Sequence, residues 1–87
     1  MEIVLFKDAK VDLEYWRKSG NKAVQKKIQE LFKDMKEHPY DGIGKPEPLK
    51  YDLSGKWSRR INYEHRIVYT VTDDLINIYS LRGHYDK

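Results

Sequence analysis

The chain has 87 residues and a net charge of only +3, so it can form one domain, residues 1–87, and its total charge identifies no partner. The absence of cysteine excludes disulfides, cysteine zinc sites and a cysteine nucleophile, and no apolar run approaches the ~20 residues of a membrane span. Charged residues at positions 2, 7, 8 and 10 interrupt the N-terminus where a secretory signal would be apolar, so we expect a soluble cytoplasmic protein without membrane contact.

The first predicted elements are a strand and a helix. Residues 3–6 are a short, β-prone apolar run. Asp8 follows directly and is predicted to cap a helix that carries Ala9, Leu13 and Trp16 on one face. Gly20 is expected to end this helix, because glycine is a common residue at helix C-termini.

A second helix is predicted between Asn21, a good capping residue, and Pro39, which cannot continue a helix. Its apolar stripe consists of Val24, Ile28, Leu31 and Met35. The opposite side carries Lys22, Lys26, Lys33 and Lys36. Residues 10–36 contain eight Lys and Arg against four Asp and Glu, so the lysine stripe is either an RNA contact or an ordinary solvated face.

The second half of the chain reads as a loop followed by strands. Residues 40–48 contain two glycines and two prolines and are expected to form an extended loop. Strand-like alternation follows at 49–53, 57–63, 67–71 and 75–81, with breaks at 54–55, 62–65 and 73–74. Because short connections require antiparallel pairing, the sequence predicts an α+β fold: an N-terminal strand, a helical hairpin and an antiparallel sheet meander.

Glu47 is a candidate general base. Pro46 and Pro48 restrict the backbone on both sides of it, which lowers the entropy lost in placing its carboxylate. Lys45 and Lys50 lie nearby in the sequence. The alternative interpretation is a turn carboxylate that lies between two prolines and has no role.

Three arginines are candidate phosphate ligands, because the planar guanidinium keeps its charge and donates two parallel hydrogen bonds. Arg59, Arg60 and Arg66 flank a tight connection. Strand alternation places Arg59 and Arg60 on opposite faces, so at most one of the two can point into a given site. Ordinary surface salt bridges are the alternative for each.

His84 and Tyr85 end the last strand, where a histidine can transfer a proton near neutral pH and a tyrosine can stack on an unpaired base. His38 and His65 are less promising, because the first is expected at a helix end and the second in a turn. The sequence shows no spacing typical of metal ligands and no glycine-rich phosphate loop, so we expect neither a metal nor another cofactor.

Together these motifs resemble the YoeB/Txe toxins of the RelE/ParE superfamily. The resemblance rests on Gly44-Lys45-Pro46-Glu47-Pro48-Leu49-Lys50, Leu53-Ser54-Gly55, Trp57-Ser58-Arg59-Arg60-Ile61, Glu64-His65-Arg66-Ile67-Val68-Tyr69 and His84-Tyr85. Tyr15-Trp16 and the lysine-rich second helix agree with it. The motifs occur in order and cover nearly the whole chain.

The resemblance implies a RelE-like fold and a type II toxin that cleaves mRNA in the aminoacyl site of the small ribosomal subunit. By motif, Glu47 is then the general base, Arg66 stabilises the phosphate, His84 is the general acid and Tyr85 positions the substrate. Lys50, Arg60 and Arg59 become basic residues that bind RNA. The implied partner is a cognate antitoxin of the YefM/Axe type, through which operator DNA would be bound, and a homodimer remains open.

Two departures from the family pattern concern the C-terminus. Asp86 and Lys87 extend beyond the His-Tyr pair, and Gly83 stands where a larger residue is usual. Two other function classes remain: a non-catalytic toxin of the same superfamily that inhibits gyrase by binding, and a plain RNA-binding module. The joint presence of Glu47, Arg66, His84 and Tyr85 argues against the first, and no row of exposed aromatics on a central strand was identified for the second.

Overall fold

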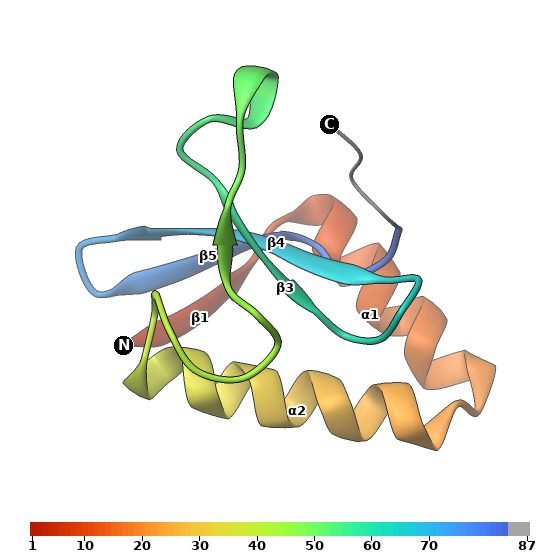
Figure 1. Cartoon of the computed structure of the whole chain (residues 1–87). Helices are drawn as coiled ribbons and strands as arrows, with labels where there is room; N and C mark the ends of the chain where they lie inside the picture. The colour runs from red at the N-terminus through yellow and green to blue at the C-terminus, as the bar shows by residue number, and fades with distance from the viewer. Residues whose placement is uncertain (84–87) are drawn as a thin grey trace.

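Five strands form one mixed sheet in the order β1-β5-β4-β3-β2, with two helices beside it (Figure 1). The computed structural model describes residues 1–83. In chain order the elements are β1 (Glu2–Leu5), α1 (Lys7–Ser19), α2 (Lys22–Glu37), β2 (Glu47–Pro48), the 3₁₀ turn η1 (Tyr51–Leu53), β3 (Trp57–Arg60), β4 (Arg66–Thr72) and β5 (Leu75–Ser80). This confirms the predicted α+β fold with its order of strand, two helices and sheet.

The strands β3, β4 and β5 form the predicted antiparallel meander. The pairing of β1 was not predicted: it lies parallel to β5, with Ile3 opposite Ile76 and Leu5 opposite Ile78. A parallel pair requires a crossover connection, and α1 and α2 lie on the stretch of chain that makes it. The N-terminal strand therefore forms one edge of the sheet and β2 forms the other.

The helix boundaries follow the predicted signals with one correction. Asn21 caps α2 by accepting a hydrogen bond from the Val24 amide at 3.1 Å, and Gly20 ends α1 in the left-handed conformation at φ 75°. Asp8 does not cap α1: the capping position is Phe6, whose amide still donates to the Ile78 carbonyl of β5. Because only Phe6 separates β1 from α1, Asp8 falls in the first turn of the helix, where its negative charge interacts favourably with the helix dipole.

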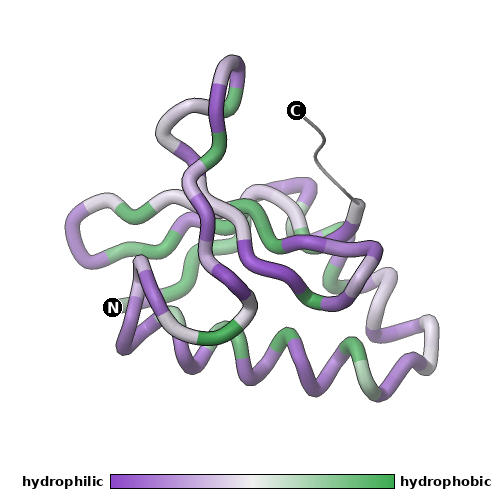
Figure 2. Tube along the Cα trace, in the orientation of Figure 1, coloured by the Kyte–Doolittle hydropathy of each residue, from purple (hydrophilic) through white to green (hydrophobic). Residues whose placement is uncertain are grey.

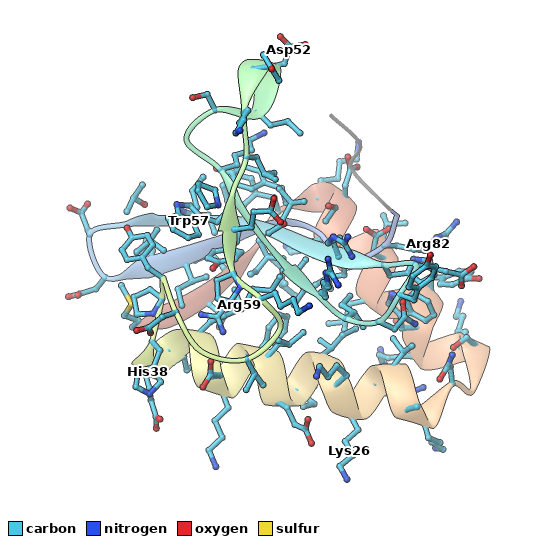
Figure 3. The ribbon with its side chains drawn as sticks, in the orientation of Figure 1. Lys26, His38, Asp52, Trp57, Arg59 and Arg82 are labelled. Atoms are coloured by element: carbon cyan, nitrogen blue, oxygen red, sulfur yellow. The ribbon has the colours of Figure 1, made fainter. Side chains whose placement is uncertain are left out.

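The strand predicted at residues 49–53 is wrong. Lys50 precedes the 3₁₀ turn η1, in which the Leu53 amide donates to the Lys50 carbonyl and the Ser54 amide to the Tyr51 carbonyl. These local bonds satisfy the backbone without a strand partner. Residues 49–56 project away from the sheet as a loop with Asp52 at its tip, and Tyr51 is 78% exposed (Figures 1 and 3). The alternating apolar residues therefore do not reach the core.

Both helices pack on the same face of the sheet. Ala9 and Trp16 of α1 and the apolar stripe of α2 join Ile67, Tyr69 and Ile76 in one buried cluster. The predicted stripe is confirmed, because Val24, Ile28, Leu31 and Met35 are all buried. Figure 2 shows the apolar positions of α2 turned toward the sheet and the hydrophilic ones turned away from it. Within residues 1–83, no helix combines the length and the apolar composition needed to cross a membrane.

Gly44 is expected to tolerate no side chain. Its φ is +82°, and a Cβ there would lie 2.7 Å from Cδ2 of Leu31 and 3.2 Å from Cβ of Arg59. Gly44→Ala should therefore lower the free energy of unfolding by about 2–4 kcal/mol, combining left-handed backbone strain with overpacking. Gly55→Ala is the matched control, because φ is +95° but nothing lies within 4 Å of its Cβ. Equal losses for the two variants in urea unfolding would exclude a steric role for Gly44.

Candidate active site

Strand pairing brings three predicted site residues to the sheet face opposite α1 and α2. Glu47 pairs with Ser58, and Arg60 pairs with Arg66. Ser58 and Arg60 are two residues apart on β3 and point the same way, so Glu47, Arg60 and Arg66 share this face. A strand spacing of ~4.8 Å and a rise of ~3.3 Å per residue separate the Cα atoms of Glu47 and Arg66 by roughly 12 Å. A phosphate group fits between the ends of two such long side chains.

Arg66 is half-buried and lines an open pocket of about 580 Å³ together with Arg60, His65 and Gly83. Its Nη1 is buried and has no hydrogen-bond partner among residues 1–83. A buried donor without a partner is costly, because its hydration is lost and not replaced. An anion in this pocket, such as a phosphate oxygen, would supply the missing acceptor.

The last described residues are held against Arg66. The Arg66 amide donates to the Gly83 carbonyl at 3.0 Å, and the Gly83 amide donates to Nδ1 of His65 at 3.0 Å. Two residues before Gly83, the backbone of Leu81 is held by α1: its amide donates to the Asp12 carboxylate at 2.9 Å, and its carbonyl accepts from Nε1 of Trp16 at 2.8 Å. Backbone and side-chain bonds from two parts of the chain, α1 and residues 65–66, thus fix residues 81–83 beside the arginine.

Gly83 suits this position, although a larger residue would be usual in the family. Its φ is +99°, a conformation that favours glycine, and none of residues 1–83 comes within 4 Å of an added Cβ. His84 and Tyr85, the predicted general acid and substrate-positioning residue, follow Gly83 in the sequence but lie outside the described residues, as do Asp86 and Lys87.

Glu47 and Lys50 are both exposed: Glu47 lies on β2 at the edge of the sheet, and Lys50 lies in the loop that follows. Glu47 belongs to the short strand β2, and the Leu49 amide continues the pairing by donating to the Lys56 carbonyl at 2.8 Å. The backbone that carries the Glu47 carboxylate is therefore held both by pairing and by the two prolines beside it. Its side chain remains free to meet a substrate.

Arg59 is removed from the predicted set of RNA-binding residues, because it is fully buried on the helix side of the sheet. Figure 3 shows it directed toward the segment after α2. All five of its N–H groups are used. The acceptors are the Tyr69 hydroxyl, the Asp34 carboxylate, and the carbonyls of His38, Asp41 and Ile43. The predicted split between Arg59 and Arg60 is confirmed, since Arg60 is exposed.

Asp34 is the charged partner of Arg59, with Oδ2 2.7 Å from Nη1 and a side chain only 21% exposed. Burial would raise the pKa of this carboxyl group, but the hydrogen bonds from Arg59 and the Ile43 amide, together with the arginine charge, lower the pKa below the usual 3.8. Burial raises the pKa of the Tyr69 hydroxyl, whose proton is donated to the Pro39 carbonyl. This cluster is structural and holds the loop after α2.

The four lysines of the predicted stripe, Lys22, Lys26, Lys33 and Lys36, are exposed on α2. Lys26 points away from the sheet (Figure 3). The stripe therefore lies on the opposite side of the molecule from the face that carries Glu47 and Arg66.

Sequence reasoning did not find the residues that support the chain near Arg66. The sequence favours no catalytic role for His65, yet its imidazole accepts a hydrogen bond from the Gly83 amide and contacts the Trp16 ring edge-to-face, with the ring centroids 4.9 Å apart. Asp12 was not singled out at all. No local signal marks these residues, because their partners lie 18 to 69 positions away in the sequence. His38, in contrast, ends α2 as predicted.

Comparison with known proteins gives one family. The profile of a family described as "YoeB-like toxin of bacterial type II toxin-antitoxin system" matches residues 6–85. Toxin YoeB of Escherichia coli strain K12 is 49% identical over 85 residues, which cover 98% of this chain and 100% of that protein.

Solved structures agree with this match. A YoeB/ParE toxin from Agrobacterium tumefaciens is similar with a TM-score of 0.92 and 39% identity, covering 98% of this chain and 100% of that one. A YoeB-YefM complex from Staphylococcus aureus is similar with a TM-score of 0.86 and 48% identity, covering 95% of each chain. A YoeB dimer from Staphylococcus aureus is similar with a TM-score of 0.88 and 45% identity, covering 98% of each chain. The resemblance inferred from the motifs is confirmed, and the chain belongs to the YoeB-like toxins of bacterial type II toxin-antitoxin systems.

Proposed function

We propose that this toxin is an endoribonuclease that cleaves mRNA on the ribosome by acid-base catalysis and so inhibits translation. The observation that carries the proposal is the buried Nη1 of Arg66, which has no partner within residues 1–83, together with the open pocket that Arg66 lines on the same sheet face as Glu47 and Arg60. Cleavage of RNA requires a base for the 2′-OH and a cation for the phosphate charge, and this face carries a candidate for each.

RNA supplies its own nucleophile in this reaction. Glu47 takes the proton from the 2′-OH, the 2′ oxygen forms a bond to phosphorus, and the bond from phosphorus to the 5′ oxygen breaks. His84 gives a proton to the departing 5′ oxygen, so the products are a 2′,3′-cyclic phosphate and a 5′-OH. Arg66, with Arg60 beside it, stabilises the charge that builds on the phosphate oxygens. Tyr85 and Lys50 position the RNA.

The ribosome contributes alignment. Each proton transfer is worth roughly 10² to 10⁴ in rate, which is too little for fast cleavage. Holding the 2′ oxygen in line with the scissile bond contributes a further large factor, because a bent, immobilised mRNA loses less entropy on reaching the transition state. The open, shallow pocket at Arg66 suits a polymer that is presented by another particle.

The direct test is to map new 5′ ends on an mRNA during translation in a purified system. The proposed enzyme generates ends that carry a 5′-OH and appear much faster when ribosomes are present on the message than on free RNA. A toxin that stops growth without new 5′ ends would instead act by binding, as the gyrase-inhibiting class does. A plain RNA-binding module would bind free RNA in a binding assay and produce no new 5′ ends.

The partners follow from the relatives. The Staphylococcus aureus structures contain a YoeB-YefM complex and a YoeB dimer. We propose that this chain is likewise neutralised by a YefM-type antitoxin encoded beside it, and that it forms a homodimer. Operator DNA would be bound through the antitoxin. Co-purification with the product of the adjacent gene, followed by mass measurement of the complex, tests both associations.

Cleavage is expected to need no divalent metal at the active site, because the proposed groups form and break the bonds by proton transfer. The ribosome has its own magnesium requirement, so the measurement uses free RNA at high protein concentration in EDTA. Slow cleavage should persist there with the same products. Strict dependence on added metal would contradict the acid-base mechanism.

The lysine stripe is expected to bind the ribosome rather than to catalyse. Changing Lys22, Lys26, Lys33 and Lys36 to glutamine should weaken ribosome binding and flatten its salt dependence, because lysine contacts to phosphate act through counterion release. Slow cleavage of free RNA should change little, since the stripe lies away from the Glu47 face. Binding across a salt series measures the effect, and an unchanged slope would mean that the stripe is only solvated.

A further inference from the structure

A second pocket adjoins the candidate active site and carries positive charge without a matching acid. It has a volume of about 400 Å³ and is lined by Lys27 of α2, Lys45, Arg60 and Tyr63, among others, none of them acidic. Within residues 1–83, no ion pair engages any of its three cations. Cations gathered around a hollow without acidic partners repel one another, so the site favours an anion.

This pocket adjoins the one at Arg66. Arg60 and Tyr63 line both, so they form the ridge between them. Arg60 lies directly opposite Arg66 in the sheet. The positive side chains thus form a path that starts at the proposed scissile phosphate on β4, crosses β3 and ends on α2.

The walls of the second pocket are held by hydrogen bonds. The Arg60 amide donates to the Gly44 carbonyl at 2.7 Å, which ties the end of β3 to the loop that carries Lys45. Asn62 accepts from the amides of Glu64 and His65 at 2.8 and 2.9 Å and so closes the turn that presents Tyr63. The pocket therefore exists before any ligand binds.

Tyr63 is the most exposed of the large hydrophobic residues in residues 1–83, at 93%. An aromatic ring in water on a closed turn has nothing to pack against in the described part of the chain. Unpaired bases stack on such rings, and stacking is tolerant of sequence because every base presents a flat face. Basic groups on one side of the ring would bind the backbone that joins the stacked base to its neighbour.

We propose that this pocket is a second subsite for single-stranded RNA. Lys27, Lys45 and Arg60 bind a phosphate next to the scissile one, and Tyr63 stacks on an adjoining base. The proposal rests on the proposed ribonuclease function and extends it, because it assigns Lys27, Lys45 and Tyr63 to the path of the mRNA beyond the bond that is cut.

The test measures binding of a fluorescent six-nucleotide RNA with 2′-O-methyl groups, by anisotropy, over 25–200 mM salt. Lys27→Gln/Lys45→Gln should flatten the plot of log affinity against log salt by up to about 0.7, since the two lysines contact one phosphate and each neutralised single-strand phosphate contributes about 0.7. Tyr63→Ala should weaken binding roughly 5- to 100-fold, while Tyr63→Phe, which keeps the ring, stays near the wild type.

The control is Lys7→Gln/Lys10→Gln, which removes the same charge from exposed positions in α1 outside both pockets. The proposal is overturned if the two double variants have the same slope, if Tyr63→Ala binds as the wild type does, or if the wild type shows no salt-dependent binding. The methylated RNA cannot be cleaved, so these results do not depend on the chemistry. Conversely, normal cleavage of translated mRNA in spite of a failed subsite would leave the proposed function intact.

Discussion

Glu47→Gln and Arg66→Ala are each expected to abolish mRNA cleavage and toxicity while the fold stays nearly intact. Glutamine keeps the shape of Glu47 but cannot take the proton from the 2′-OH, a loss of about 10² to 10⁴ in rate. Removing Arg66 deletes a preorganised charge at the phosphate, for which a loss of about 10² to 10³ is typical. Primer extension on translated mRNA and growth after induction measure the two effects.

Stability should change little in both variants. Glu47 is exposed. Nη1 of Arg66 has no hydrogen-bond partner within residues 1–83, so removing the Arg66 side chain deprives no acceptor of that donor. Circular dichroism and thermal unfolding check this. The matched controls are Glu37→Gln and Arg17→Ala, which make the same changes at exposed positions of α2 and α1 and should remain fully toxic. If Glu47→Gln and Arg66→Ala are as toxic as these controls, the assignment is wrong.

Arg59→Met is expected to remove a large part of the stability of the fold, with a loss of about 3–5 kcal/mol in the free energy of unfolding. The substitution leaves the Asp34 carboxylate, three loop carbonyls and the Tyr69 hydroxyl without their donor. The total free energy of unfolding of a small domain is only about 5–15 kcal/mol. Arg60→Met is the control, because this neighbour is exposed and its replacement should cost less than about 0.5 kcal/mol.

The ion pair between Arg59 and Asp34 also predicts a pH dependence of stability. The pKa of Asp34 is lower in the folded chain than its ordinary value of 3.8, so the stability that this gives is present above pH 3.8 and is lost as the pH falls through the folded pKa. The difference in unfolding free energy between the wild type and Arg59→Met should therefore be constant near neutral pH and shrink below pH 3.8. Urea unfolding followed by tryptophan fluorescence measures it. A difference that grows toward acid pH would contradict this account of the pair.

Local sequence signals were sufficient for much of the fold. Both helices, their apolar faces and the exposure of the lysine stripe follow from a 3.6-residue period and the capping residues Gly20 and Asn21, which act within one turn. The meander follows from period-two alternation and short turns. The alternation also separated Arg59 from Arg60. Each of these features depends on neighbours in the chain.

The same alternation failed at residues 49–53. Leu49, Tyr51 and Leu53 alternate as a strand would, but Tyr51 has φ of 60° and the backbone forms consecutive turns. A strand requires a partner at its edge, and a period of two in the sequence does not show whether one is present. The edge strand β2 therefore has only two residues, and its Glu47 carboxylate lies next to the projecting loop.

Long-range contacts account for the rest. Three features depend on residues 10 to 73 positions apart in the sequence. They are the parallel pairing of β1 with β5, the burial of Arg59 against Asp34, and the contacts by which Asp12, Trp16 and His65 hold residues 81–83 beside Arg66. The motifs named the candidate residues Glu47, Arg60 and Arg66, because residue type already carries the chemistry. Their placement on one face, and the exclusion of Arg59 from it, required the packed sheet, because burial and hydrogen-bond satisfaction are properties of residues brought together by folding.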